Sequence, residues 1–143
     1  MQEVIKKRKR VNILMVEDNY LDALLTTEIL SDTDRADYRV STVKDGVEAL
    51  AYLHGLDKYE NAPLPDLIIL DLNLPRMNGF DFLARIKKET GLKTIPVCIL
   101  TTSEAKEDVE KAKELQTDCY LIKPLDLKTF EEAFSGISSG SPD

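Results

Sequence analysis

Four short, almost wholly apolar runs and one alternating run are spaced along the chain, and each ends in polar or turn-forming residues. Continuous apolar runs of this length predict strands that are covered on both faces. The predicted strands lie at residues 11–16, 38–43, 67–70, 97–100 and 119–122. The second of them differs from the rest, because polar and apolar residues alternate along it.

Helical periodicity follows each of these runs. Asp18-Asn19 supplies capping chemistry before Tyr20, where the first helix is predicted to begin. Its apolar stripe is assigned to Leu21, Leu24, Leu25 and Ile29. The other helices are predicted after Asp45-Gly46, after Gly79, from Glu104 to Leu115, and along Leu127, Phe130, Phe134 and Ile137. The helix that starts at Glu104 has only a thin apolar stripe, as in the weakly anchored elements that switches use.

Strand and helix therefore alternate five times, with no linker and no second domain. Such alternation predicts a parallel sheet between two layers of helices. Right-handed crossovers leave few topologies, and we predict an α/β, flavodoxin-like, doubly wound fold with strand order 2-1-3-4-5 and five helices. The domain is placed at residues 11–137, between a basic N-terminal tail at 1–10 and a frayed C-terminal tail at 138–143.

Composition narrows the class of protein. The 143 residues are 43% hydrophobic and 31% charged, which suits one globular domain and excludes a disordered or membrane protein. A net charge of −7 argues against nucleic-acid binding, and the one basic cluster, Lys6 to Arg10, is interpreted as a solvated tail. No signal segment follows the basic N-terminus, so we expect a cytoplasmic protein.

The two cysteines, Cys98 and Cys119, lie on separate predicted strands, and their spacing is not that of metal ligands. We expect two buried free thiols in a reducing compartment.

Chemically active side chains follow the predicted strands. Glu17-Asp18 follows the first, Asp71 the third, Thr101 the fourth and Lys123 the fifth. Because the carboxyl ends of parallel strands open on one edge, where ligands bind in such sheets, these side chains are predicted to converge. Each alone has an ordinary explanation, such as a helix-capping charge, a turn residue or a solvated lysine. Their combination in this strand order favours a site.

Three clustered carboxylates repel one another, and a divalent cation relieves that repulsion. Oxygen ligands of this kind favour Mg²⁺, which also accepts phosphate oxygens. Lys123 and Thr101 can serve a phosphoryl group, so the set predicts phosphoryl transfer to a carboxylate. Asp71 is the best nucleophile, since it ends the most apolar central strand.

The sequence resembles that of response-regulator receiver domains of two-component signalling. The resemblance is carried by Val16-Glu17-Asp18-Asn19, by Asp71-Leu72-Asn73-Leu74-Pro75 with Asn78-Gly79, by Leu100-Thr101, and by Tyr120-Leu121-Ile122-Lys123-Pro124. It covers nearly the whole chain, from about Val11 to Ile137.

The resemblance implies a role for each matching residue. Asp71 matches the phosphoacceptor, Thr101 the switch hydroxyl, Tyr120 the switch aromatic and Lys123 the phosphate-binding lysine. Asp18 matches a direct Mg²⁺ ligand, Glu17 a ligand through water, and Asn73 the residue whose backbone carbonyl reaches the metal. The Lys123-Pro124 bond is expected to be cis, as is common in this family.

Within the family, Tyr59-Glu60-Asn61-Ala62-Pro63 and the later motifs resemble small regulators that partner phytochrome-type histidine kinases. Thr102 departs from the small residue usual beside the switch threonine, which would restrict access to Asp71. Only one helix and a short tail follow Pro124, so we expect a stand-alone phosphorelay regulator that accepts a phosphoryl group from a kinase phosphohistidine. We expect it to catalyse only its own phosphorylation and the hydrolysis of its own aspartyl phosphate.

The predicted switch face combines the fourth helix, the fifth strand and the fifth helix. In one interpretation, the core does not need both Phe130 and Phe134, and one of them lies on the surface. This interpretation predicts a homodimer through this face. In the other, both rings are buried in the core.

Three other classes of function fit the residues less well. An aspartate-nucleophile phosphatase needs a second Asp two residues after the nucleophile, where this chain has Asn73, which cannot shuttle a proton. A degenerate receiver that serves only as an interaction module is disfavoured, because no member of the predicted site is missing. A histidine phosphodonor is excluded as a main role, because the single histidine, His54, is placed on a surface helix.

Overall fold

Five parallel strands form one sheet in the order β2-β1-β3-β4-β5 in the computed structural model, which describes residues 8–139 and their side chains up to residue 137. The strands are β1 (Lys9–Val16), β2 (Ala36–Val43), β3 (Leu67–Leu70), β4 (Val97–Thr101) and β5 (Cys119–Ile122). Every residue of β3 and β4 is buried, as their unbroken apolar runs predict. The predicted flavodoxin-like α/β fold and its strand order are confirmed.

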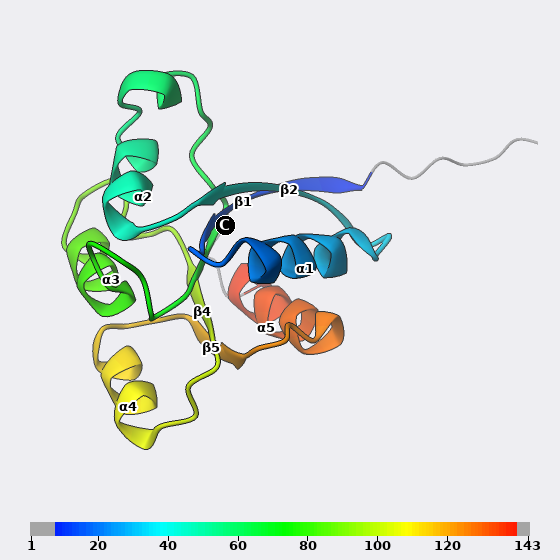
Figure 1. The fold of residues 1–143 in the computed structure, drawn as a ribbon. Helices are drawn as coiled ribbons and strands as arrows, with labels where there is room; N and C mark the ends of the chain where they lie inside the picture. Colours follow the sequence, from blue (N-terminus) through cyan, green and yellow to red (C-terminus); the bar gives the residue numbers. More distant parts are fainter. Residues whose placement is uncertain (1–7, 140–143) are drawn as a thin grey trace, which may run out of the picture.

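Helices cover both faces of the sheet (Figure 1). They are α1 (Tyr20–Ser31), α2 (Gly46–Leu53), α3 (Gly79–Lys87), α4 (Lys106–Glu114) and α5 (Leu127–Ser139). The α1 and α5 helices lie on one face, and α2, α3 and α4 lie on the other. Residues of each strand alternate between the two cores: Leu14 and Val16 pack with the α2–α3 side, and Ile13 and Met15 with the α1–α5 side.

The ends of the domain differ slightly from the prediction. The β1 strand begins at Lys9, two residues early, because Lys9 and Arg10 pair with Ala36 and Asp37 of β2. The predicted basic tail otherwise falls at residues 1–7, outside the described residues. The α5 helix continues to Ser139, and the remainder of the predicted C-terminal tail, 140–143, also lies outside them. A short 3-10 turn, η1 (Asp57–Tyr59), was not expected.

The predicted apolar stripe of α1 is wrong. The residues of α1 that are buried are Ala23, Thr26 and Leu30. Leu21 is 70% exposed, and Leu24 and Leu25 are also on the outer side. Of the four residues of the predicted stripe, only Ile29 packs against the core. Apolar residues lie on more than one side of the helix, so the three leucines did not mark its inner face.

Cys98 and Cys119 are partners in the register between β4 and β5, and a disulfide joins them with their Cα atoms 4.6 Å apart. The prediction of two free thiols is therefore wrong. The two cysteines are 21 positions apart, and the sequence alone does not reveal that the strand register places them side by side.

The two phenylalanines of α5 differ in burial. Phe130 is a core residue with 1% exposure, whereas Phe134 is half-buried and stacks on it with ring centroids 5.9 Å apart. No helix among the described residues is long and apolar enough to cross a membrane.

Candidate functional site

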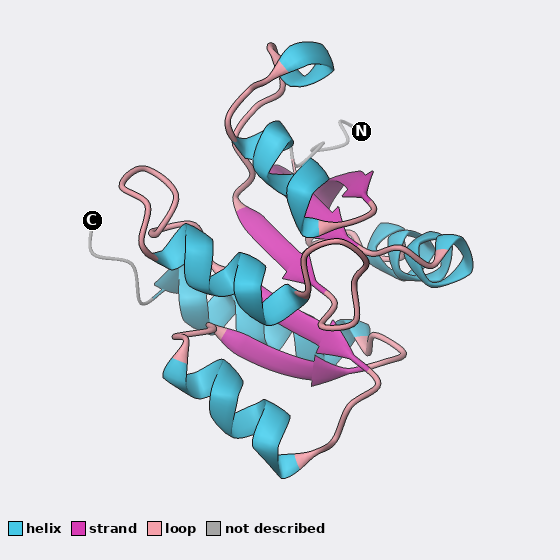
Figure 2. Ribbon diagram, turned by 60° about the vertical axis from the view of Figure 1, so that its left-hand side comes forward, coloured by secondary structure: helices cyan, strands magenta, loops and turns pink. Residues whose placement is uncertain are grey.

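The carboxyl ends of the strands bring the predicted residues to one edge of the sheet (Figure 2). The hydrogen-bond ladder continues one residue past β1, β3 and β5. The Asp71 N–H donates to the Val16 carbonyl at 3.1 Å, and the Lys123 N–H donates to the Thr101 carbonyl at 2.8 Å. Asp71 is thereby fixed next to Glu17, and Lys123 next to Thr101.

Three carboxylates gather at this edge. One oxygen each from Glu17, Asp18 and Asp71 lies within 4.8 Å of the others. Glu17 and Asp71 are 5% and 7% exposed, whereas Asp18 is open to solvent. Burial raises the pKa of the Glu17 carboxyl despite the nearby ammonium of Lys123. Three carboxylates face the one ammonium of Lys123, so the cluster carries a net negative charge.

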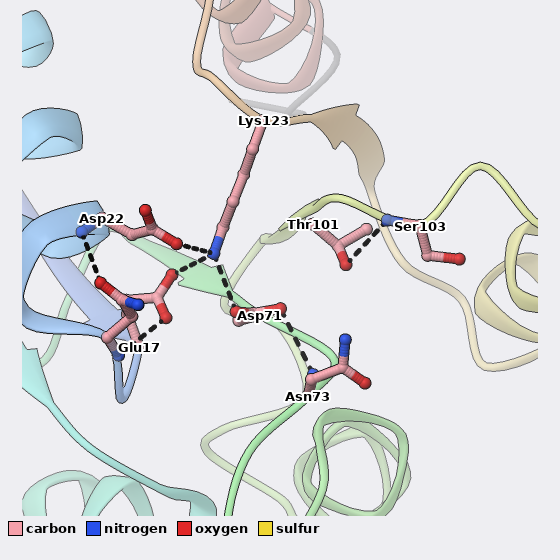
Figure 3. A network of polar contacts seen from close by, with 8 residues as sticks. Glu17, Asp22, Asp71, Asn73, Thr101, Ser103 and Lys123 are labelled. Atoms are coloured by element: carbon pink, nitrogen blue, oxygen red, sulfur yellow. Dashed lines mark hydrogen bonds and ion pairs between the residues drawn. The ribbon is translucent and has the colours of Figure 1, made fainter.

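Lys123 extends from the end of β5 into the acidic cluster (Figure 3). Its Nζ lies 2.5 Å from Glu17, 2.9 Å from Asp71 and 3.0 Å from Asp22. Burial alone would lower the pKa of Lys123, but hydrogen bonds to the three carboxylates raise it well above its ordinary value. The side chain therefore carries a positive charge at any physiological pH. The Lys123-Pro124 bond that follows is cis, as expected.

The loop after β1 is shaped by Asn19. Its side chain caps α1 by accepting the Asp22 N–H at 3.0 Å, and its own N–H donates to Glu17 at 3.1 Å. Glu17 and Asp22 are thereby held on the two sides of one short turn.

The loop after β3 is packed tightly beneath Asp71. The Asn73 N–H donates to Asp71 Oδ1 at 3.3 Å. Any side chain at Gly79 would collide with the Asp71 carbonyl, so only glycine allows α3 to start this close to the nucleophile. Asn78 caps that helix by accepting the Asp81 N–H.

The predicted switch residues meet at Ser103. Thr101 is fully buried, and its Oγ1 accepts the Ser103 N–H at 3.3 Å. The Tyr120 hydroxyl donates to the Ser103 carbonyl at 2.9 Å. The hydroxyl of Ser103 donates to Asp108 of α4 at 2.5 Å. One serine thus links β4, β5 and α4.

The structure gathers Glu17, Asp18 and Asp71 in one cluster with Lys123, bonds Asn73 to Asp71, and bonds the Lys123 N–H to the Thr101 carbonyl. Tyr120 is joined to Thr101 through Ser103. The residue missed by sequence analysis is Asp22. Its signal was its place in the first turn of a helix capped by Asn19, four residues after Asp18. His54 lies apart at the end of α2, where its Nε2 is 2.6 Å from Glu89.

The donor set suits a small, hard divalent cation. It offers several carboxylate oxygens within reach of one point, buried negative charge, and a backbone loop fixed against Asp71. The cluster contains no sulfur ligand, and Cys98 and Cys119 form a disulfide with each other. The residues present therefore fit the predicted Mg²⁺.

A buried aspartate at the end of β3, an acidic pair after β1 and a lysine after β5 define a receiver-type site on this fold. The sequence profile of the response regulator receiver domain matches residues 13–135. The chain belongs to this family and is a receiver-domain response regulator of two-component signalling.

Individual relatives narrow the match. The chain is 44% identical to response regulator Rcp1 of Synechocystis sp. over 127 residues. This alignment covers 89% of the chain and 86% of Rcp1. It also resembles the crystal structure of the phosphorylated cyanobacterial phytochrome response regulator RcpA. There the TM-score is 0.76 and the identity 41%, with 91% of this chain and 92% of RcpA covered.

A third comparison concerns the metal. The Mn²⁺-bound form of Rcp1 matches with a TM-score of 0.74 and 42% identity, covering 91% of this chain and 93% of Rcp1. The predicted resemblance to regulators associated with phytochromes is confirmed. Receiver domains bind a divalent metal at the acidic cluster, and this chain has that cluster.

Proposed function

We propose that this protein accepts a phosphoryl group from the phosphohistidine of a histidine kinase onto Asp71, in a Mg²⁺-dependent reaction. The observation that carries the proposal is the placement of Asp71, which is nearly buried, lies 2.9 Å from the Lys123 ammonium and shares a cluster with Glu17 and Asp18. A carboxylate held between acids and a single cation is arranged to receive a group that brings its own negative charge together with a metal.

The residues of the chain have distinct tasks in this transfer. A carboxylate oxygen of Asp71 forms the new O–P bond as the P–N bond to the donor imidazole breaks, and the imidazole leaves with the electron pair. Lys123 binds one phosphoryl oxygen, and the Thr101 hydroxyl donates to another. Glu17, Asp18, Asp71 and the backbone carbonyl of Asn73 would hold Mg²⁺, which would neutralise charge on the phosphoryl oxygens.

Hydrolysis of the aspartyl phosphate is the only other reaction proposed for the site. A phosphatase acting on foreign substrates would need an acid/base two residues after Asp71, and Asn73 occupies that position. The protein is therefore proposed as a phosphoacceptor of a phosphorelay and not as an enzyme with other substrates.

The proposed partner is a phytochrome-type histidine kinase in the cytoplasm. Similarity to RcpA, a cyanobacterial phytochrome response regulator, supports this choice. Neither a nucleic acid nor a membrane is proposed as a partner.

Phosphorylation is proposed to act on the face formed by α4, β5 and α5. Inward movement of Thr101 toward a phosphoryl oxygen would disturb Ser103, and through it Tyr120 and Asp108. We propose a homodimer through this face. Since Phe130 is buried, the apolar surface available for it rests on half-buried Phe134 and on Ile122, which is 38% exposed.

Incubation with acetyl phosphate and Mg²⁺, followed by intact-mass measurement, tests the proposal. One acid-labile phosphoryl group is expected on the wild type, and none without Mg²⁺ or on Asp71→Asn. A phosphoryl group retained by Asp71→Asn would show that the nucleophile is wrongly assigned.

A further inference from the structure

Lys123 has an acidic partner that the proposed phosphoryl transfer does not use. Asp22 lies in the first turn of α1 and approaches the lysine from the side opposite Asp71 (Figure 3). Its carboxylate is 3.0 Å from Nζ, and its side chain is 42% exposed. It does not belong to the cluster of carboxylates that fits a metal.

The three partners of Lys123 use up its hydrogen-bonding capacity. An ammonium group has three N–H donors and no acceptor. Within the described chain, Lys123 has one ion pair each with Glu17, Asp71 and Asp22. Phosphorylation converts the Asp71 carboxylate into an acyl phosphate, so the Lys123 donor that serves Asp71 can pass to a phosphoryl oxygen. Any further bond between Lys123 and the phosphoryl group requires Glu17 or Asp22 to give up its place.

Asp22 is the partner that can leave at the least cost. Glu17 is almost fully buried, so the loss of its hydrogen bond to Lys123 would leave a desolvated charge. The Asp22 carboxylate already contacts water. It also lines a cavity of about 230 Å³ beside Lys123 and Pro124, into which it can turn.

We propose that Asp22 is a positioning residue that holds Lys123 in the unphosphorylated state and opposes the phosphorylated one. This inference rests on the function proposed above and deepens it. The negative charge of Asp22 has opposite effects on two ligands: it favours a metal cation at the cluster and disfavours a phosphoryl group at Asp71. As a third partner, it also divides the charge of Lys123 among three acids, two of which, Glu17 and Asp71, would bind the metal.

The chain contains a matched control. Asp81 occupies the same place in α3 as Asp22 does in α1, three residues after a capping asparagine. The cap of α3 accepts the Asp81 N–H at 2.9 Å, and the cap of α1 accepts the Asp22 N–H at 3.0 Å. Both carboxylates lie in the first turn of a helix with an asparagine cap, but only Asp22 is paired with Lys123.

Two titrations on wild type, Asp22→Asn and Asp81→Asn test the inference. Calorimetry measures Mg²⁺ affinity, and fluorine NMR measures the affinity for beryllofluoride, an acyl-phosphate analogue, at saturating Mg²⁺. Asp22→Asn should bind Mg²⁺ about three- to tenfold more weakly and beryllofluoride about three- to tenfold more tightly, as expected for removal of one nearby unit charge. Asp81→Asn should match the wild type, and Asp22→Glu should restore both affinities toward wild type.

Opposite changes in the two affinities are the signature of the proposal, because loss of a helix cap would not separate them. The inference is overturned if Asp22→Asn leaves both affinities unchanged, weakens both, or behaves like Asp81→Asn. Failure of the wild type to bind beryllofluoride at saturating Mg²⁺ is a different result, since it contradicts the proposed function itself and the inference with it.

Discussion

The α3 and α4 helices lie side by side on one face of the sheet, yet they are anchored very differently (Figure 1). The α3 helix buries three large apolar side chains, Phe82, Leu83 and Ile86, and begins with an asparagine cap. The only buried residue of α4 is Ala112, and its N-cap residue, Ala105, has no side-chain hydrogen bond. Packing thus fixes α3, while α4 depends on a few weak contacts.

The loops before these helices differ in the same direction. Arg76, in the loop before α3, makes two hydrogen bonds to the buried carboxylate of Asp45, at 2.8 and 3.1 Å. The loop before α4 depends on Ser103, which is bonded to Thr101, Tyr120 and Asp108. The loop before α3, on the side of the phosphoacceptor, is therefore held by packing and charge. The loop before α4, which would report phosphorylation, is held by the hydrogen bonds of one serine.

This contrast separates two requirements of a switch. The residues that bind the metal and the phosphoryl group must keep their geometry, and the element that changes the surface must have a low cost of rearrangement. The contrast between α3 and α4, which follow the neighbouring strands β3 and β4, meets both requirements.

Matched leucine substitutions provide the strongest test of the contrast. Leu83→Ala in α3 should lower the free energy of unfolding by about 2–5 kcal/mol, because it empties a fully buried site. Leu115→Ala, at the half-buried end of α4, should cost roughly 1–2 kcal/mol, since water already reaches part of the side chain. Urea unfolding measures both. Equal losses would mean that α4 is as firmly anchored as α3.

Hydrogen exchange tests the same contrast without a mutation. Amides of α4 should exchange on the order of tenfold faster than those of α3, because their helix has fewer buried contacts. Beryllofluoride with Mg²⁺ should change the protection of α4 and leave that of α3 almost constant. A change confined to α3 would place the switch on the wrong helix.

Exchanging the two helix caps should reduce the difference by a smaller amount. Asn78→Ala removes the α3 cap and should cost about 1 kcal/mol, and Ala105→Asn should stabilise α4 by up to about 1 kcal/mol. The backbone at Ala105 already has the extended conformation that a cap requires. Thermal unfolding measures the first effect and exchange at α4 the second. Destabilisation by Ala105→Asn would indicate that the new side chain displaces Ser103.

The fold could be predicted from the sequence because buried parallel strands are unbroken apolar runs, as Leu67–Leu70 illustrates. The site followed from the strand ends, since parallel strands deliver Glu17, Asp71 and Lys123 to one edge. The inner face of α1 could not be predicted, because two of its three buried side chains are the small Ala23 and Thr26, whereas three of its leucines are exposed.

Two further features depend on distances that no local pattern encodes. The Cys98–Cys119 bond needs the register of β4 on β5, which apolar runs do not specify. The contact of Asp22 with Lys123 joins residues 101 positions apart. A carboxylate in a first helical turn has an ordinary explanation in the helix dipole, so its second role appears only in three dimensions.

The smallest expected effect is a pH dependence of the loop before α3. Burial would raise the pKa of Asp45, but the hydrogen bonds from Arg76 and from the Glu48 N–H lower it below its ordinary value of 3.8. A carboxyl with a lowered pKa in the folded state adds stability that is present in full above the unfolded pKa and is lost as the pH falls through the folded one.

Asp45→Asn should therefore reduce stability most at neutral pH, and its deficit against wild type should shrink only below about pH 4, where the wild-type carboxylate becomes protonated. Asparagine can still cap α2, so the charge and not the cap is tested. Urea unfolding from about pH 3 to pH 7 measures the deficit. Arg76→Gln should flatten the same pH dependence, because it removes the cation that lowers the Asp45 pKa. If the deficit of Asp45→Asn is the same at every pH, the ion pair does not hold this loop, and the fixed side of the comparison rests on packing alone.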